Sequence, residues 1–361
     1  MPRRAAPSGP DLVAWDVAER VATQALRALA APGAGVQADL ASDLADATAR
    51  AERLVEAETG LVSNAGPAVA RVTDRAGWVS ANVGSFRQLL RPVGARLARR
   101  PATRRALNPA ARTAAGVEIG LLLTWMSTRV LGQYDLLASE AGGVVYYVAP
   151  NIAALEHRHG FPPDEFRLWI ALHEVTHRTQ FTAVDWLRPY FLGLVERGTE
   201  LAVPDGRAIL EALWRAAQEI RAGRNPLAEA GVAGLLASSE QLATLREAQA
   251  LMTLLEGHSD VVMSRAGAAA VPSARRFHDV LAERRASASG LVRLLQQVAG
   301  IEAKLRQYRE GEAFVEAVER AGGAELLALV WSGPEMLPTL DEIRDPSRWV
   351  ARVGGTARAA T

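Results

Sequence analysis

The 361-residue sequence contains no cysteine. It therefore has no disulfide framework, no thiol nucleophile and no thiolate metal site, and any metal must be bound by His, Asp or Glu. The sequence also lacks an excess of either charge, with 41 basic and 40 acidic residues and a formal net charge of +1. Because nucleic-acid-binding domains usually carry a clear basic excess, we expect no nucleic-acid partner.

Long hydrophobic runs and targeting segments are missing as well. The first 20 residues include Asp11, Asp16 and Glu19, where a signal peptide needs an apolar run. The longest apolar stretch, residues 119–128, is about half as long as a bilayer span requires. We therefore expect a cytoplasmic protein with no membrane partner. Hydrophobic residues still make up 49% of the chain, which is enough for a sizeable core and excludes a mainly disordered protein.

Most of the chain has apolar residues at the spacing of helices. This pattern is clear over residues 11–30 and 36–58, and the apolar segment 118–137 is typical of a buried helix. Val144–Val148 contains five β-branched or aromatic residues, lies between glycines and Pro150, and is the one convincing strand. Later helices are predicted over residues 162–181, 207–222, 239–265, 273–298 and 299–320.

These segments predict a mainly α protein of the α+β class with a small β-sheet. We expect an N-terminal helical region over residues 1–110 and a second domain over residues 111–361, and the two could pack as one unit. Residues 331–352 are rich in Pro and Trp, and we expect them to form an irregular tail over the core.

The segment His173–Glu174–Val175–Thr176–His177 is an HExxH motif. Pro162 and Pro163 precede it and predict that a helix begins there. On a helix, His173 and His177 project from the same face and can bind one tetrahedral Zn²⁺. Glu174 is placed to act as general base and then to pass the proton to a leaving amine. The alternative, a surface helix with two histidines, fits the apolar surroundings of the motif poorly.

A third ligand must come from elsewhere in the chain. The extended pattern HExxHxxGxxH fails, because Gln180 and Ala183 stand where it needs Gly and His. On a later helix, Glu256 could bind the metal while Asp260, four residues on, accepts a hydrogen bond from a zinc-bound imidazole. His258 competes with Glu256, but the two lie about 200° apart on a regular helix and cannot both face one metal. We favour Glu256 and keep His258 as the alternative ligand.

Catalysis would also need a hydrogen-bond donor near the developing oxyanion. Tyr308, Tyr146, Tyr147 and His258 are candidates, and we retain Tyr308 as a catalytic candidate, although a buried tyrosine is more often a core residue. The strand over residues 144–148 could pair with an extended peptide substrate, or it could be an ordinary core strand.

The segment Phe166–Phe181 resembles the zincin-like metallopeptidase family of actinobacteria and relatives, most of all a subgroup labelled as associated with biosynthesis of coenzyme F-420. The similarity extends to residues 130–135, 148–151, 256–258, 304–308 and 334–339. It implies a zincin-like core in the second domain, with His173 and His177 as zinc ligands and Glu174 as acid/base. It also implies a third ligand on a later helix, which we place at Glu256. Arg178 departs from the uncharged residue that zincins usually have after the second His.

The sequence therefore favours a zinc-dependent hydrolase, specifically a metallopeptidase with a peptide or protein substrate. The alternative is a zinc-stabilised helical scaffold that binds a partner, has little or no turnover, and is associated with deazaflavin coenzyme metabolism. The complete HExxH motif favours the enzyme, because a purely structural site has no need of Glu174 and usually has four protein ligands.

Overall fold

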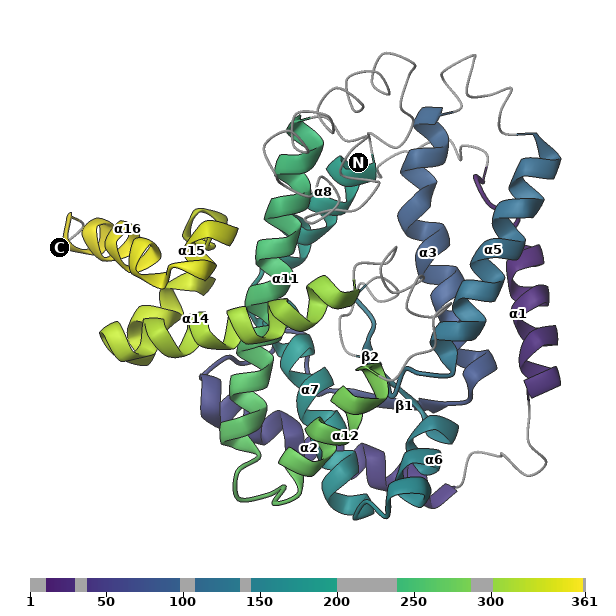
Figure 1. Cartoon of the computed structure of the whole chain (residues 1–361), viewed down its shortest axis with the longest axis horizontal. Coiled ribbons are helices and arrows are strands. Elements are labelled where there is room, and N and C mark those ends of the chain that lie inside the picture. The colour runs from purple at the N-terminus through teal and green to yellow at the C-terminus, as the bar shows by residue number, and fades with distance from the viewer. Residues whose placement is uncertain are drawn as a thin grey trace. The chain divides into compact units, whose positions relative to one another are not determined.

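The computed structural model describes residues 11–29, 38–97, 108–136, 144–199, 239–286 and 301–359 (Figure 1). Contacts divide the chain into two compact units: unit 1 comprises residues 1–183 and 266–274, and unit 2 comprises residues 184–265 and 275–361. The predicted mainly α fold with a small sheet is confirmed. The helix expected at 207–222 lies outside the described residues. These two units are defined by contacts and do not test where independently folding domains begin. The domain boundary expected after residue 110 therefore stays a prediction.

Unit 1 combines six described helices with a three-stranded sheet. The helices are α1 (Trp15–Leu29), α2 (Ala38–Thr59), α3 (Arg75–Leu97), α5 (Pro109–Ser127), α6 (Ala149–His159) and α7 (Pro163–Ala183). The strands are β1 (Val69–Thr73), β2 (Gly132–Tyr134) and β3 (Val144–Val148). Strand β3 is central, with β1 parallel to it on one side and β2 antiparallel on the other. The predicted strand is confirmed, whereas its two partners were missed.

The segment expected as one buried helix over residues 118–137 changes structure part-way. Helix α5 ends at Ser127, and the chain then turns into the edge strand β2. The side-chain amide of Asn151 holds this turn, because it donates to the backbone oxygens of Ser127 and Val130, both at 2.7 Å. The amide of Val148 also donates to Leu131 O at 2.9 Å. The turn therefore depends on the last residue of strand β3 and on Asn151 just beyond it.

Helices α1 and α5 lie side by side with their backbones close together (Figure 1). A Cβ atom at Gly116 would lie 2.6 Å from the backbone oxygen of Ala14, just before α1, and one at Gly120 would lie 2.5 Å from that of Ala18 in α1. This crossing therefore requires glycine at both positions. Another face of α5 exposes Leu121 and Leu122, which are 53% and 49% exposed. The expectation of a buried helix is therefore wrong for this face of α5.

Unit 2 contains α8 (Leu187–Thr199), α11 (Ser239–Ala266), α12 (Ala274–Ala286), α14 (Ile301–Ala328), α15 (Leu340–Arg344) and α16 (Pro346–Ala359), with short 3-10 turns at Leu329–Trp331 and Pro334–Met336. The bounds of α11 and α12 each extend one residue into unit 1. Phe314 of α14 meets Trp349 of α16 edge to face at 5.7 Å between ring centroids, inside an apolar cluster. The expectation of an irregular tail over residues 331–352 was wrong, because the tail forms two turns and two helices around this cluster.

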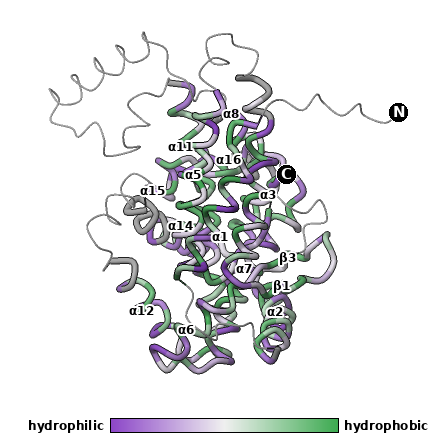
Figure 2. Tube along the Cα trace, turned by 90° about the vertical axis from the view of Figure 1, so that its right-hand side faces the viewer, coloured by the Kyte–Doolittle hydropathy of each residue, from purple (hydrophilic) through white to green (hydrophobic). Residues whose placement is uncertain are grey.

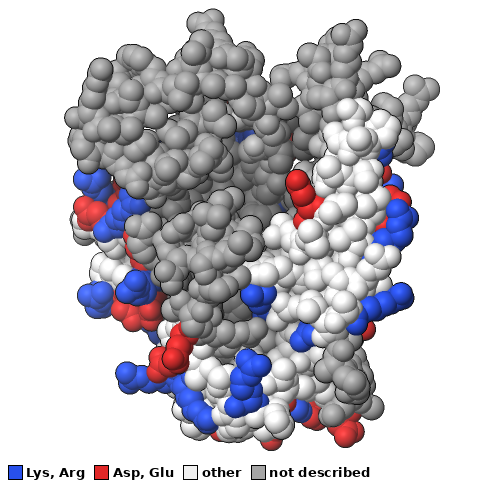
Figure 3. Space-filling view, turned by 45° about the vertical axis from the view of Figure 1, so that its right-hand side comes forward, with Lys and Arg blue, Asp and Glu red and all other residues white. Residues whose placement is uncertain are grey.

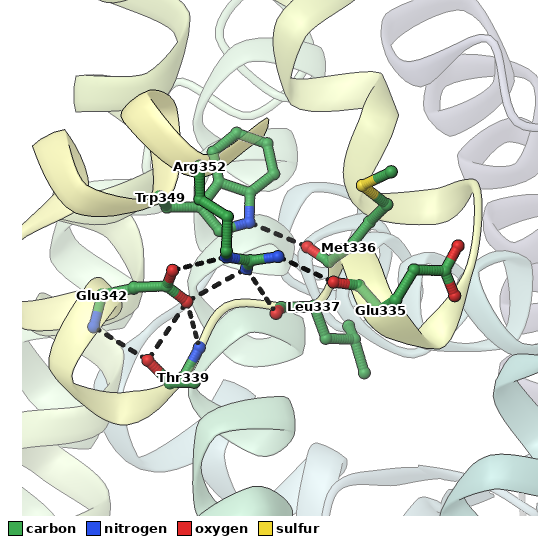
Figure 4. A network of polar contacts seen from close by, with 7 residues as sticks. All are labelled: Glu335, Met336, Leu337, Thr339, Glu342, Trp349 and Arg352. Atoms are coloured by element: carbon green, nitrogen blue, oxygen red, sulfur yellow. Dashed lines mark hydrogen bonds and ion pairs between the residues drawn. The ribbon is translucent and has the colours of Figure 1, made fainter. Parts of the chain in front are cut away.

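A carboxylate and a guanidinium fasten this C-terminal segment (Figure 4). Glu342 and Thr339 form a capping box at the start of α15. Arg352 of α16 binds Glu342 through two contacts of 2.6 and 3.0 Å and donates to the backbone oxygens of Glu335 and Leu337. Burial by itself would raise the pKa of Glu342, but hydrogen bonds from Arg352 and Thr339 lower it below its usual value.

The hydropathy of the helices bears on membrane partners, and the distribution of surface charge bears on nucleic-acid partners. Among the described residues, none of the helices combines the length and the hydropathy needed to cross a membrane, and hydrophobic and hydrophilic stretches alternate along the chain in Figure 2. Among the described residues on the face shown in Figure 3, basic and acidic side chains are scattered among uncharged ones and form no block of one sign.

The Glu342 network predicts a pH-dependent loss of stability in Glu342→Gln. The folded state lowers the pKa of this carboxyl, so its contribution is complete above the unfolded value of about 4.3 and disappears as the pH falls through the lower folded value. Denaturant unfolding should show Glu342→Gln to be less stable than the parent at pH 7, with the difference shrinking under acid. Glu325→Gln, at an exposed site in the same unit, is the control. A difference that does not change with pH would contradict this explanation.

Candidate metal centre

Helix α7, which carries the HExxH motif, begins at Pro163, one residue from the predicted start. Its first turn holds Asp164 and Glu165, whose negative charges are stabilised by the positive end of the helix dipole. Glu165 also accepts a hydrogen bond from the backbone amide of Ser273 at 2.7 Å. Most of the helix from Phe166 to Gln180 is buried, so α7 is a core element rather than a surface helix.

Two arginines fix the rotation of α7 about its axis. Arg167 and Arg178 are eleven residues apart and so lie on one helix face. Arg167 binds Glu156 of α6 at 2.8 and 2.9 Å and also pairs with Asp43 of α2. Arg178 is wholly buried, donates to Glu52 of α2 at 2.7 Å and also bonds the backbone oxygen of Gly66. Arg178, the unusual charged residue after the second His, is therefore directed towards α2.

The two histidines of the motif lie together on another face of α7, about 110° round the helix from the arginines. The ring centroids of His173 and His177 are 4.6 Å apart, and the ring planes are nearly perpendicular. Both side chains are half-buried. As the motif predicts, the structure brings both imidazoles to one place.

Glu174 of the same motif contacts the sheet, and the residue is 9% exposed. Its Oε2 accepts a hydrogen bond from the backbone amide of Tyr134, on strand β2, at 2.9 Å. A Cβ atom at Gly132 would lie 2.6 Å from Cγ of Glu174 and 2.9 Å from its Oε1. The edge strand thus provides both a donor and the space for this carboxylate. Neither contribution was predicted, since residues 130–135 stood out only by their resemblance to a family.

The tyrosines proposed as oxyanion donors have other partners where the structure describes them. The hydroxyl of Tyr147 lies 2.7 Å from Thr48 Oγ1, and burial, followed by the nearby charge of Glu174, raises the pKa of this phenol. The hydroxyl of Tyr146 accepts a hydrogen bond from Arg71 at 3.1 Å. The side chain of Tyr308 lies outside the described residues, so its role stays a prediction.

Glu256, Asp260 and His258 are all on α11. Glu256 and His258 are buried, and Asp260 is half-buried. His258 meets Trp331 edge to face at 5.1 Å between ring centroids. Gly257, which lies between Glu256 and His258 in the sequence, packs on α14. A Cβ atom added there would lie 2.1 Å from the backbone carbonyl carbon of Gly311. Successive residues of the stretch Glu256–Gly257–His258 therefore point in different directions. That Asp260 accepts a hydrogen bond from a zinc-bound imidazole stays a prediction.

In the part of the chain that the structure describes, His173, His177 and Glu256 form a group that could hold a metal ion. Each offers one ligand atom, and these three atoms lie within 4.8 Å of one another. Two imidazoles and a carboxylate, without any thiolate, form a donor set of the kind found at catalytic zinc sites. The residues present therefore fit the ion that the motif indicates.

The fold and this donor set agree with the family to which the chain belongs. Residues 13–350 match the zincin-like metallopeptidase family, so the chain is a member of it. It is also similar to the crystal structure of a "putative hydrolase with a novel fold" from Chloroflexus aurantiacus. The two are 33% identical with a TM-score of 0.70, over 95% of this chain and 99% of the other. No curated protein matches the chain.

The contact between Gly132 and Glu174 predicts a specific defect in Gly132→Ala. The added methyl group must displace the carboxylate, for which the HExxH motif predicts a role in proton transfer. Turnover of a peptide found by library screening is therefore expected to fall about 10-fold or more. Zinc content should not change, because neither histidine moves. Gly84→Ala, at a position in α3 with no atom within 4 Å of the new Cβ, is the control. Parent-like turnover in Gly132→Ala would show that this contact does not position Glu174.

Proposed function

We propose that the chain is a zinc-dependent hydrolase that cleaves peptide bonds in peptide or protein substrates. The observation that carries the proposal is the pair of imidazoles on one face of α7 with a held carboxylate beside them. A purely structural zinc site would have no use for the edge-strand contacts of Glu174. Membership of the zincin-like metallopeptidase family and the similarity to a protein described as a hydrolase support the same class of reaction.

In this proposal, His173 and His177 hold the ion, and Glu256 is the third protein ligand. Their proximity supports this choice over His258, which packs against Trp331. When bound, zinc would supply a Lewis acid for the scissile carbonyl and would lower the pKa of a water towards 7. Three protein ligands leave a coordination position open, as catalytic zinc sites do.

Glu174 carries the proton in this mechanism. Its Oε2 accepts from the Tyr134 amide, so we assign proton transfer to Oε1. The carboxylate takes a proton from the attacking water and then delivers it to the nitrogen of the leaving amine as the peptide bond breaks. The contacts with strand β2 keep the carboxylate in one orientation through both steps, which reduces the entropy lost in each transfer.

Metal content tests the ligand assignment. Elemental mass spectrometry of protein purified without added metal or chelator should find about one zinc per chain, as expected for one three-ligand site. His173→Ala and Glu256→Ala should each lose it, whereas His258→Ala should keep it. Loss in His258→Ala with retention in Glu256→Ala would move the third ligand to His258. A parent chain that binds no zinc even when zinc is supplied would contradict the hydrolase and favour the scaffold.

Turnover tests the role of Glu174. Glu174→Gln keeps an oxygen that can accept from the Tyr134 amide but cannot take a proton, so zinc content should stay at the parent level. Cleavage of a library-derived peptide should fall by about 10²- to 10⁴-fold, the usual effect of losing a general base. Parent-rate cleavage by this variant would rule out the mechanism.

A further inference from the structure

Gln180 is a wholly buried polar residue on α7, three positions after His177. Residues three apart are neighbours on a helix surface. The side-chain oxygen Oε1 of Gln180 lies 3.0 Å from Nδ1 of His177, which is hydrogen-bond distance. The position drew attention in the sequence only because it lacks the glycine of the extended zincin motif.

The chemistry of this contact determines which nitrogen of His177 can bind a metal. An amide oxygen only accepts hydrogen bonds, so Nδ1 must be the protonated nitrogen that donates to it. In a neutral imidazole the other nitrogen, Nε2, then carries the lone pair. Only an unprotonated ring nitrogen can coordinate zinc. The contact with Gln180 therefore selects the tautomer in which Nε2 is the ligand atom.

The same contact restricts the orientation of the ring. Hydrogen-bond acceptors behind metal-binding histidines fix both tautomer and ring orientation and increase ligand basicity. Carboxylates, backbone carbonyls and water often fill this role, and a side-chain amide oxygen is chemically equivalent to a backbone carbonyl. Gln180 cannot easily turn away, because its side chain is enclosed in the core.

We propose that Gln180 is a positioning residue for the metal site, which holds His177 in the tautomer and orientation that present Nε2 to zinc. The proposal rests on the proposed function, since it requires His177 to be a ligand. It concerns metal affinity and not the proton transfer by Glu174. Gln180 thus supplies the hydrogen-bond acceptor for His177 from the same helix, α7.

The test compares Gln180→Leu, which removes the acceptor at similar volume, with Gln180→Glu, which keeps one. Zinc affinity of the full chain is measured by competition with a chromophoric chelator. We expect Gln180→Leu to bind zinc about 10- to 100-fold more weakly than the parent and Gln180→Glu to bind it at least as tightly. If Gln180→Leu fails to fold, Gln180→Met, unbranched and similar in length, replaces it.

Thr182→Val is the matched control, because it removes a hydrogen bond to the backbone oxygen of Arg178 in the same part of α7 without touching His177. Its zinc affinity should equal that of the parent. A second readout needs no metal: the ¹⁵N chemical shifts of His177 in the metal-free protein, above about pH 8, report the tautomer of the neutral ring. The parent should show protonated Nδ1, and Gln180→Leu a mixture of tautomers.

The outcomes separate this proposal from the proposed function. Parent-like zinc affinity and an unchanged tautomer in Gln180→Leu, with a parent that binds zinc, would overturn the role of Gln180 alone. A parent that binds no zinc would overturn both. Weaker binding in Gln180→Leu together with a mixture of His177 tautomers supports the positioning role, because a simple packing defect would not change which ring nitrogen is protonated.

Discussion

The anchoring of α7 by two arginines constrains the rest of the site. Arg167 and Arg178 face α2 and α6, and their partners are carboxylates and a backbone oxygen. Removing one partner of a buried ion pair commonly costs about 3–5 kcal/mol, because the other charge is left without compensation. Rotation of α7 about its axis would break both anchors at once. With that rotation fixed, the directions of the histidines, Glu174 and Gln180 follow from the helical repeat.

The second constraint is close approach of backbone to functional side chains. At Gly132 the edge strand approaches the Glu174 carboxylate so closely that no side chain fits between them. At Gly257 two helix backbones touch beside Glu256. Gly132 is in contact with Glu174, and Gly257 follows Glu256 in the sequence; both carboxylates have a proposed chemical role. Because neither glycine has a side chain, the backbone of a strand or helix can lie close to each of these places. Precise placement of reacting groups depends on rigid support of this kind.

Local pattern was sufficient to predict part of this structure. Helix α7 and strand β3 have strong periodicity or composition of their own, and the spacing of His173 and His177 on a helix requires no tertiary knowledge. Strands β1 and β2 lack such a signal, because they are short and exist by pairing with β3. The end of α5 depends on Asn151, more than twenty residues away in the chain. The amide that holds Glu174 is a backbone group, which no side-chain motif can reveal.

The stretch Glu256–Gly257–His258 shows how a weak sequence signal becomes specific once its neighbours are known. Successive residues on a helix point about 100° apart, so these three cannot serve the same neighbour. The contact of Gly257 with Gly311 and that of His258 with Trp331 account for two of the three directions. The third belongs to Glu256, a buried carboxylate close to the two imidazoles. A buried carboxylate is stable only when it is paired or coordinates a metal, so of these three residues Glu256 has the chemistry that the proposed ligand role requires.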